Sequence, residues 1–333
     1  MNYLITLIPL KPFFFGGDVT FGKLGDKEEG NYLVKSRLFP QQTAILGMIR
    51  KEILIQAGLL TTKVNGEWVD NKEKAKELIG DTKFKFNQPN DFGDLERISP
   101  VFLMRKNQKF IKKVAIDRYE YKKGLLYKKN QKDENDKYFT AKDDMYDNFI
   151  STDNKKCLKT KAIFREVVQV GNKKKATKED PKRKNSFYKK TSYLLKDNFK
   201  FAFYIKSDFK LENSFVTLGA DKSTFKMEVK KVKDDEWLKY EDKNGYLTLL
   251  SDAYIDVPLK DNCEFAITSE ISFGFLENKF EKKKRIFKKS DKTYYLYEKG
   301  SVFIGTKPKL IDSLENEHLE KIGMNIFTQG EKK

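Results

Sequence analysis

Short runs of aromatic and β-branched residues, separated by polar turn residues, recur along most of this chain. The first run, Tyr3 to Ile8, is closed by Pro9 and predicts a strand buried in a sheet. Further candidate strands are 164–170, 187–195, 199–205, 225–232, 246–250, 265–271 and 294–297. Because these strands outnumber the helices that the sequence predicts, we expect an α+β fold.

One segment, Gln41 to Ala57, stands out for its helical periodicity. Pro40 precedes it and Gly58 follows it, which are typical start and stop signals. Apolar residues recur there at helical spacing: Ile45, Met48, Ile49 and Ile53. The first amides of a helix are unpaired and lie at the positive end of its dipole. A helix that starts just after Lys35 and Arg37 is therefore expected to attract a phosphate.

The remaining organisation predicts three parts. Residues 1–60 contain the first strand and the predicted helix, and 162–333 contain the remaining strands. Residues 61–161 lack clear periodicity and are rich in Lys, Asn and Asp, so we interpret them as a large insertion. Within the third part, Lys196 to Asn198 are turn residues that predict a hairpin between the strands on either side.

Charge narrows the choice of partners. Sixty-seven Lys and Arg residues against 49 Asp and Glu give a formal net charge of +18, which favours a polyanionic partner. No stretch approaches the roughly 20 apolar residues of a membrane span, and the N-terminus lacks the features of a secretory signal. We therefore expect a cytoplasmic protein that binds nucleic acid and no membrane. The lysine excess has an alternative origin in an AT-rich genome, in which case the surface would serve protein contacts alone.

Histidine and cysteine are scarce. The chain has a single histidine, His318, and two cysteines, Cys157 and Cys263, that lie far apart and in no metal-ligand spacing. Histidine is the usual proton shuttle and a common metal ligand near neutral pH. The sequence thus predicts no metal, no cofactor and no catalytic activity.

Two basic runs could follow a nucleic-acid backbone. The run at 281–289 is equally typical of a solvated hairpin tip. The run that contains Lys173, Lys174 and Lys175 is flanked by Arg165 and by aromatic residues, Phe187, Tyr188 and Tyr193. Cations for phosphates beside rings for bases are what single-stranded RNA requires.

A loop punctuated by glycine follows the first strand. Its residues Phe13, Phe14 and Phe15 are more typical of a core than of a stacking platform. Gly16 and Gly17 come next, and glycine alone readily adopts the positive φ angles that allow a backbone to approach a ligand closely.

Taken in order, several segments resemble the third-subunit family of the type III-B (Cmr) CRISPR effector complex, within the RAMP superfamily. They are the Phe-containing loop, the segment 39–50 (Phe-Pro-Gln-Gln-Thr-Ala-Ile-Leu-Gly-Met-Ile-Arg), the segment 218–223 (Leu-Gly-Ala-Asp-Lys-Ser) and the segment 297–302 (Tyr-Glu-Lys-Gly-Ser-Val). Near the C-terminus, residues 319–327 lack the glycine cluster of the superfamily.

The resemblance implies two ferredoxin-like (RRM-like) halves with a Lys-rich thumb insertion at 61–161. Residues 1–60 would form the first part of the N-terminal half, and 162–333 the remaining strands and the C-terminal half. It also implies a non-catalytic subunit that holds the 5′ handle of the crRNA and docks on the large polymerase-type subunit, beside backbone RAMP subunits, with indirect access to target RNA. RNA contacts are carried over to Gly16, Gly17, Ser36, Arg37, Gln41, Gln42, Gly219, Asp221 and Lys222. Two alternatives stay open: a RAMP endoribonuclease that processes pre-crRNA, and the equivalent subunit of a type III-A (Csm) complex.

Overall fold

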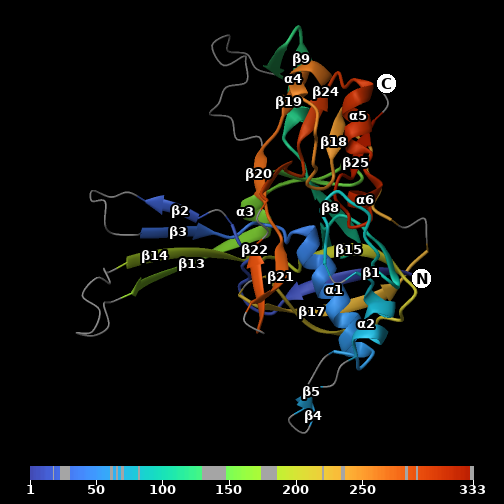
Figure 1. The fold of residues 1–333 in the computed structure, drawn as a ribbon. Coiled ribbons are helices and arrows are strands. Elements are labelled where there is room, and N and C mark those ends of the chain that lie inside the picture. Colours follow the sequence, from blue (N-terminus) through green and yellow to red (C-terminus); the bar gives the residue numbers. More distant parts are fainter. Residues whose placement is uncertain are drawn as a thin grey trace.

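A nine-stranded sheet, which we call the main sheet, forms the body of the molecule (Figure 1). The computed structural model describes residues 1–17, 19–22, 31–60, 63–64, 67–68, 71–81, 83–129, 148–173, 186–219, 221–233, 237–281, 284–289 and 292–330. The strand order is β12 (Cys157–Lys159), β11 (Asn148–Ser151), β8 (Gln108–Lys112), β7 (Phe102–Arg105), β15 (Lys200–Ser207), β1 (Asn2–Pro9), β17 (Ser223–Lys231) and β16 (Ser214–Leu218). Strand β6 (Leu95–Ile98) also pairs with β15. The central strand β1 runs antiparallel to both of its neighbours, β15 and β17.

Alternation of side chains divides the main sheet into two buried faces. Ile5 and Leu7 of β1 are fully buried and join a core cluster with Ile45 and Ile49 of helix α1 (Gln42–Gln56). Helix α2 (Lys72–Ile79) lies beside α1 (Figure 1). Tyr204 points to the opposite face, where a second cluster contains residues of the C-terminal part of the chain. Both faces of β1 and β15 are therefore covered by protein, as their near-continuous apolar sequences require.

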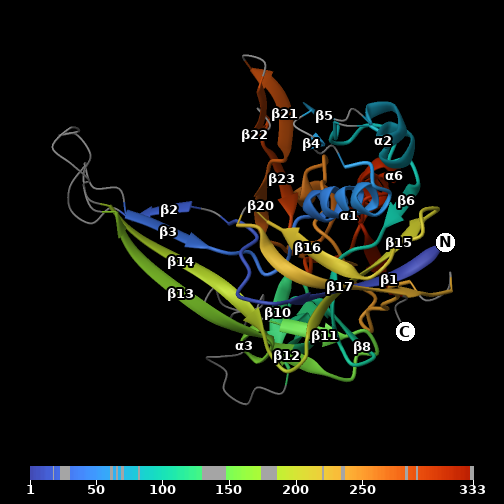
Figure 2. The same cartoon turned by 90° about the horizontal axis from the view of Figure 1, so that it is seen from below.

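A four-stranded sheet, here called the arm, projects from the body in both views (Figures 1 and 2). Its order is β13 (Phe164–Lys173), β14 (Ser186–Leu195), β3 (Asn31–Lys35) and β2 (Val19–Gly22). A short helix, α3 (Thr160–Ile163), leads into β13. Strand β14 pairs in parallel with β3, which brings two segments about 150 residues apart into contact.

A second four-stranded sheet, which we call the C-terminal sheet, lies in the last third of the chain. Its order is β19 (Phe265–Ile267), β24 (Val302–Ile304), β18 (Leu247–Leu249) and β25 (Phe327–Gln329). Leu310 and Leu314 of helix α5 (Pro308–Leu314) pack on this sheet against Phe303. Two short helices, α4 (Leu259–Asn262) and α6 (Glu317–Glu320), lie before and after α5 in this part.

Smaller elements complete the described structure. They are the strand pairs β4 (Lys63–Val64) with β5 (Glu67–Trp68), β9 (Tyr119–Lys122) with β10 (Leu125–Lys128), β20 (Glu270–Phe273) with β23 (Tyr294–Tyr297) and β21 (Leu276–Glu281) with β22 (Lys284–Lys289), and a 3-10 turn at Ile116–Arg118. Among the described residues, none forms a helix long and apolar enough to cross a membrane.

The α+β class and the helix at 42–56 are confirmed, but the predicted hairpin is wrong. Its two strands exist as β14 and β15, and Asp197 and Asn198 between them have the positive φ angles of a turn. They do not pair with each other, because β14 belongs to the arm and β15 to the main sheet. The turn carries the chain from one sheet to the other.

The segment 61–161 is not confirmed as a separate insertion. Five strands within it, β6, β7, β8, β11 and β12, belong to the main sheet, so that much of the segment forms part of the body. Strand β8, for example, contributes Phe110 to the main core. The strand pattern of this segment was weak in the sequence because the strands are short and are separated by lysine-rich turns.

Candidate nucleic-acid interface

The loop at Phe13–Gly17, which we call the N-terminal loop, is joined by its backbone to three distant segments. Phe13 exchanges backbone hydrogen bonds with Tyr193 of β14, with N···O distances of 2.8 and 3.1 Å. The Phe14 N–H donates to Ser223 Oγ at 3.1 Å, and the Phe15 N–H donates to Ser36 Oγ at 2.9 Å. The loop is thus fixed to the arm, to the start of β17 and to the connection between β3 and α1.

Three glycines allow this close packing. A Cβ atom at Gly17 would lie 1.8 Å from the carbonyl oxygen of Lys35, so no larger residue fits without moving the backbone. Gly16 has φ +79° and its carbonyl accepts a hydrogen bond from the Arg37 N–H at 2.7 Å. Gly219, which also has a positive φ, passes so close that a Cβ would lie 2.5 Å from the Phe14 carbonyl oxygen. The predicted RNA-contact segments 16–17, 35–37 and 219–222 therefore meet at one place.

The phenylalanines of the N-terminal loop lie in the core, as the sequence favoured. Phe13 is fully buried and packs edge-on against Phe201, with ring centroids 5.2 Å apart. Phe15 stacks on Phe225 with centroids 5.9 Å apart. These rings anchor the loop and are not free to stack on bases.

Cationic side chains surround the N-terminal loop on the arm side. Lys35 pairs with Glu166 at 2.9 Å, and the hydrogen bond between them raises the pKa of Lys35 and lowers that of Glu166. Both side chains are more than half exposed, so the pair is weak and can exchange its partner for a phosphate. The ammonium group of Lys190 lies 4.6 Å from the centre of the Phe14 ring and pairs with Asp221. Asp221 therefore offsets one of the local cations.

The register of the arm aligns further exposed groups with these cations. Lys189 of β14 lies opposite Val170 of β13 and Leu33 of β3, and all three are exposed. Two residues further along β14, on the same face, Thr191 lies between Val168 and Lys35. One face of the arm thus presents Lys35 and Lys189 among apolar side chains, which suits a chain of phosphates and bases.

The structure places three of the other predicted cations, Arg165, Lys173 and Lys222. Arg165 is exposed and lies on the face of the arm opposite to Lys35, because strand residues alternate. Lys173 is the last residue of β13, whereas Lys174 and Lys175 lie outside the described residues. Lys222 is exposed and has φ +50° in the turn that precedes β17.

The predicted phosphate site at the start of α1 is not supported by the geometry. Pro40 is buried, and the Gln42 side-chain amide donates to the carbonyl oxygens of Ser99, Ile322 and Gly323 at 2.9 to 3.1 Å. Gln41 has extended backbone angles, and its carbonyl accepts the N–H of residue 45. Gln42 thus fastens α1 to the C-terminal segment, and these three protein acceptors already occupy its side-chain amide.

Ser36 and Arg37 also have protein partners. Ser36 is 4% exposed and its hydroxyl donates to the Arg37 carbonyl at 2.8 Å. The Arg37 guanidinium donates to the carbonyl of Ser272 in β20 at 2.7 Å. Ser36 acts through the shape of the N-terminal loop, while half-buried Arg37 retains further N–H donors, because a guanidinium carries five.

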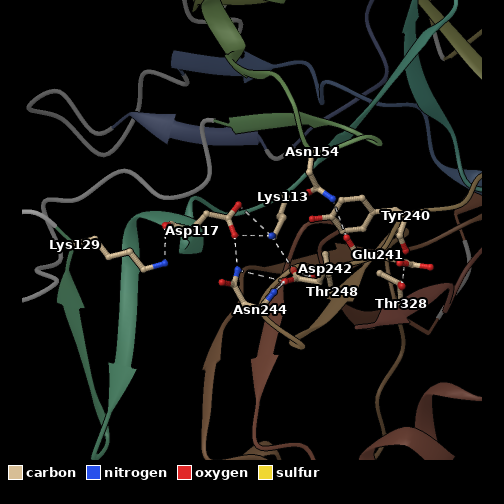
Figure 3. Close-up of polar contacts among 10 residues, drawn as sticks. All are labelled: Lys113, Asp117, Lys129, Asn154, Tyr240, Glu241, Asp242, Asn244, Thr248 and Thr328. Carbon is tan, nitrogen blue, oxygen red and sulfur yellow. Dashed lines mark hydrogen bonds and ion pairs between the residues drawn. The ribbon is translucent and has the colours of Figure 1, made fainter. Parts of the chain in front are cut away.

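A buried polar cluster surrounds Lys113 and brings several ionisable groups together (Figure 3). Lys113 is 2% exposed and pairs with Asp242 at 2.8 Å and with Asp117 at 3.0 Å. Burial alone would lower the pKa of Lys113, but the adjacent Tyr240, Asp117 and Asp242 together raise it above its usual range. Burial also raises the pKa of Tyr240 to about 12. A general base needs a pKa near the working pH, so this lysine and tyrosine are suited to holding the fold rather than to moving a proton.

The single histidine and the carboxylates are the remaining candidate groups. His318 lies in the short helix α6 and is half-buried. In the part of the chain that the structure describes, no group of three or more His, Cys, Asp or Glu side chains could hold a metal ion.

Sequence reasoning missed Lys190, which lies over the Phe14 ring of the N-terminal loop, and Lys189, which shares a face of the arm with Lys35. Alternation along 186–195 indicates that the two lysines point to opposite faces. Their position depends on the parallel pairing of β14 with β3, which the sequence does not specify.

Comparison with known protein families places the chain in one of them. The family model described as "CRISPR-associated protein (Cas_Cmr3)" matches residues 5–256, which include the N-terminal loop, the arm and β17. The chain belongs to the Cas_Cmr3 family. This confirms the resemblance that the loop and helix-start motifs indicated. No curated protein matches the chain.

Solved structures share the fold of this Cas_Cmr3 protein. A chain of the structure described as "Cryo-EM structure of the Type III-B Cmr-beta bound to cognate target RNA" is 16% identical, with a TM-score of 0.53. The match covers 99% of the present chain and 96% of the other. A second structure, of the same complex bound to cognate target RNA and AMPPnP in state 1, gives 16% identity, a TM-score of 0.50 and coverages of 98% and 96%.

Proposed function

We propose that this Cas_Cmr3 protein is a non-catalytic RNA-binding subunit of a type III-B Cmr effector complex. In this role it holds the 5′ handle of the crRNA and docks on the large polymerase-type subunit. The backbone RAMP subunits lie beside it and it meets target RNA only indirectly, in the cytoplasm. The main sheet and the C-terminal sheet would correspond to two ferredoxin-like halves.

The convergence of three segments on the N-terminal loop carries the proposal. Gly17 contacts the backbone of Lys35, Gly219 contacts that of Phe14, and Lys190 lies over the Phe14 ring. A backbone this closely packed cannot rearrange freely, so the strands that carry the surrounding cations keep fixed positions. Fixed cations spaced along a sheet are the arrangement that binds a single RNA strand without base pairing.

The arm extends this surface away from the body. Lys189 and Lys35 lie on the same face in adjacent strands, two residues apart in register. Exposed Val168, Val170 and Leu33 lie between and beside them. We propose that the phosphates contact the lysines while the handle bases lie against the apolar side chains.

Salt dependence tests this assignment of phosphate contacts. We expect the double variant Lys35→Gln/Lys189→Gln to bind a labelled crRNA handle less tightly than the unchanged protein. We expect the slope of log K against log salt to become shallower by about 0.7 for each phosphate contact removed. Fluorescence anisotropy over a series of salt concentrations measures both quantities.

Two controls separate this surface from general charge. Lys155→Gln/Lys210→Gln removes the same charge from exposed lysines away from the N-terminal loop and should leave the slope unchanged. Glu166→Gln removes the acidic partner of Lys35 and should tighten binding. An equal loss in both double variants, or an equal loss of heparin binding, contradicts the proposal.

A further inference from the structure

A cavity of about 400 Å³ lies at the opposite end of β1 from the N-terminal loop. Its lining residues are Asn2, Arg97, Ile98, Ser99, Pro100, Lys206, Trp237, Leu238 and Ile326. The first six belong to the main sheet or its edges, and the last three belong to segments that lead to the C-terminal sheet. Strand β1 has eight residues at about 3.3 Å each, so its length separates this cavity from the proposed handle surface.

The register of the main sheet places two cations side by side at the cavity. Lys206 pairs with Arg97 of β6 on one side and with Asn2 of β1 on the other, so these three side chains share a face. Lys206 forms an ion pair with Glu96 at 2.8 Å, in which both side chains are more than 40% exposed. Such an exposed pair contributes little stability and can yield to a more highly charged anion.

Aromatic stacking continues from the core to this pair of cations. The Trp237 ring stacks on Tyr204, with centroids 6.0 Å apart and planes inclined by 21°. The guanidinium of Arg97 lies 5.3 Å from the centre of the Trp237 ring. A guanidinium held by an indole keeps its in-plane N–H groups available for phosphate and presents its outer face to a further ring.

The chemistry of the lining restricts the ligand. Two cations select an anion, a stacked guanidinium accepts a flat ring, and Ile98, Pro100, Leu238 and Ile326 provide apolar walls. Ligand pockets range from about 300 to 1,000 Å³, so this one has room for a single small molecule and not for a folded peptide segment. A nucleobase that carries a phosphate combines both properties in that size.

We propose that this cavity binds one phosphorylated nucleotide unit, either as a free mononucleotide or as the phosphorylated end of an RNA strand. The phosphate contacts Arg97 and Lys206, and the base lies against the guanidinium and the apolar walls. Binding here also ties the segment at Trp237 to the main sheet. The site is separate from the handle surface, so each proposal can fail without the other.

Trp237 provides the readout. Trp68 is the other tryptophan of the chain, so a full-length Trp68→Phe protein reports on Trp237 alone. We expect nucleoside monophosphates to change its fluorescence in a saturable manner. We expect Arg97→Gln in the same background to weaken binding by about tenfold or more, the loss typical of a charged hydrogen bond. Lys206→Gln should act in the same direction, and an unphosphorylated nucleoside should bind more weakly.

Matched controls decide the specificity and the source of the ligand. Arg105→Gln removes another guanidinium that lies over a ring, that of Phe199, but outside the cavity, and should leave affinity unchanged. Comparison of mononucleotides with 5′-phosphorylated and 5′-hydroxyl trinucleotides shows whether the ligand is free or is an RNA end, and either result supports the site. The absence of saturable binding for all of these, an equal loss in Arg105→Gln, or equal binding of an acidic tripeptide overturns the proposal.

Discussion

Replacement of Lys113 by methionine is expected to lower the free energy of unfolding by about 3–5 kcal/mol, because it leaves the buried carboxylate of Asp242 without a cation. Asp242 is fully buried and Lys113 is 2% exposed, so water cannot replace the lost partner. Asp242 also accepts hydrogen bonds from the Thr248 hydroxyl and the Asn244 backbone N–H. The substitution therefore disturbs the contact between the end of the main sheet and β18. Urea denaturation followed by circular dichroism measures the change.

An exposed pair of the same kind provides the control. Lys122 pairs with Glu120 at 2.8 Å, but both side chains are more than half exposed. Lys122→Met should change the free energy of unfolding by less than about 1 kcal/mol. A double variant, Lys113→Met/Asp242→Asn, should recover part of the loss, since it no longer buries an unpaired charge. Similar losses for Lys113→Met and Lys122→Met would show that the cluster in Figure 3 does not behave as a buried ion pair.

Replacement of Gly17 by alanine is expected to have the second large effect, on both stability and RNA affinity. Its Cβ would lie 1.8 Å from the Lys35 carbonyl oxygen, so the N-terminal loop must move away from β3. Overpacking of this kind typically costs about 1–3 kcal/mol. The movement also displaces the hydrogen bonds of Ser36 and Arg37. We expect handle affinity to fall with the stability, measured by anisotropy and by urea denaturation of the same preparation.

The same substitution elsewhere should have the opposite sign. Gly47 is exposed in the middle of α1, and a Cβ there would meet no atom within 4 Å. Gly47→Ala should stabilise the protein by about 0.4–1 kcal/mol, because it reduces the freedom of the unfolded chain. If Gly17→Ala is as well tolerated as Gly47→Ala, the close approach of the loop to Lys35 is not essential.

Local patterns predicted the elements of this fold better than their partners. The helix expected over Gln41 to Ala57 forms at 42–56, and the strand expected over Tyr3 to Ile8 forms at 2–9. Each of these elements shows its type in its own sequence, through the spacing of its buried side chains. The pairing of 187–195 was wrong because a turn at Asp197 and Asn198 is compatible either with a hairpin or with a change of sheet.

Local patterns also predicted part of the candidate site, but not its long-range contacts. Motifs located Gly16, Lys35 and Gly219, which the structure brings together around one loop. The start of α1 was interpreted as a phosphate site because the unpaired amides of a helix start can be predicted from the local sequence alone. The sequence could not show that Gln42 bonds to a segment 280 residues away. Long-range packing thus distinguishes exposed Lys35 from Gln42, whose side chain is buried against protein.

Cross-linking of the RNA to the protein in a reconstituted complex tests the central claim most directly. Ultraviolet cross-linking followed by mass spectrometry identifies the peptides that touch a crRNA with a photoreactive handle. We expect cross-links in peptides that contain the N-terminal loop, Lys35 to Arg37, or Lys189 and Lys190. Handle cross-links confined to the C-terminal sheet, with none in these peptides, would contradict the account.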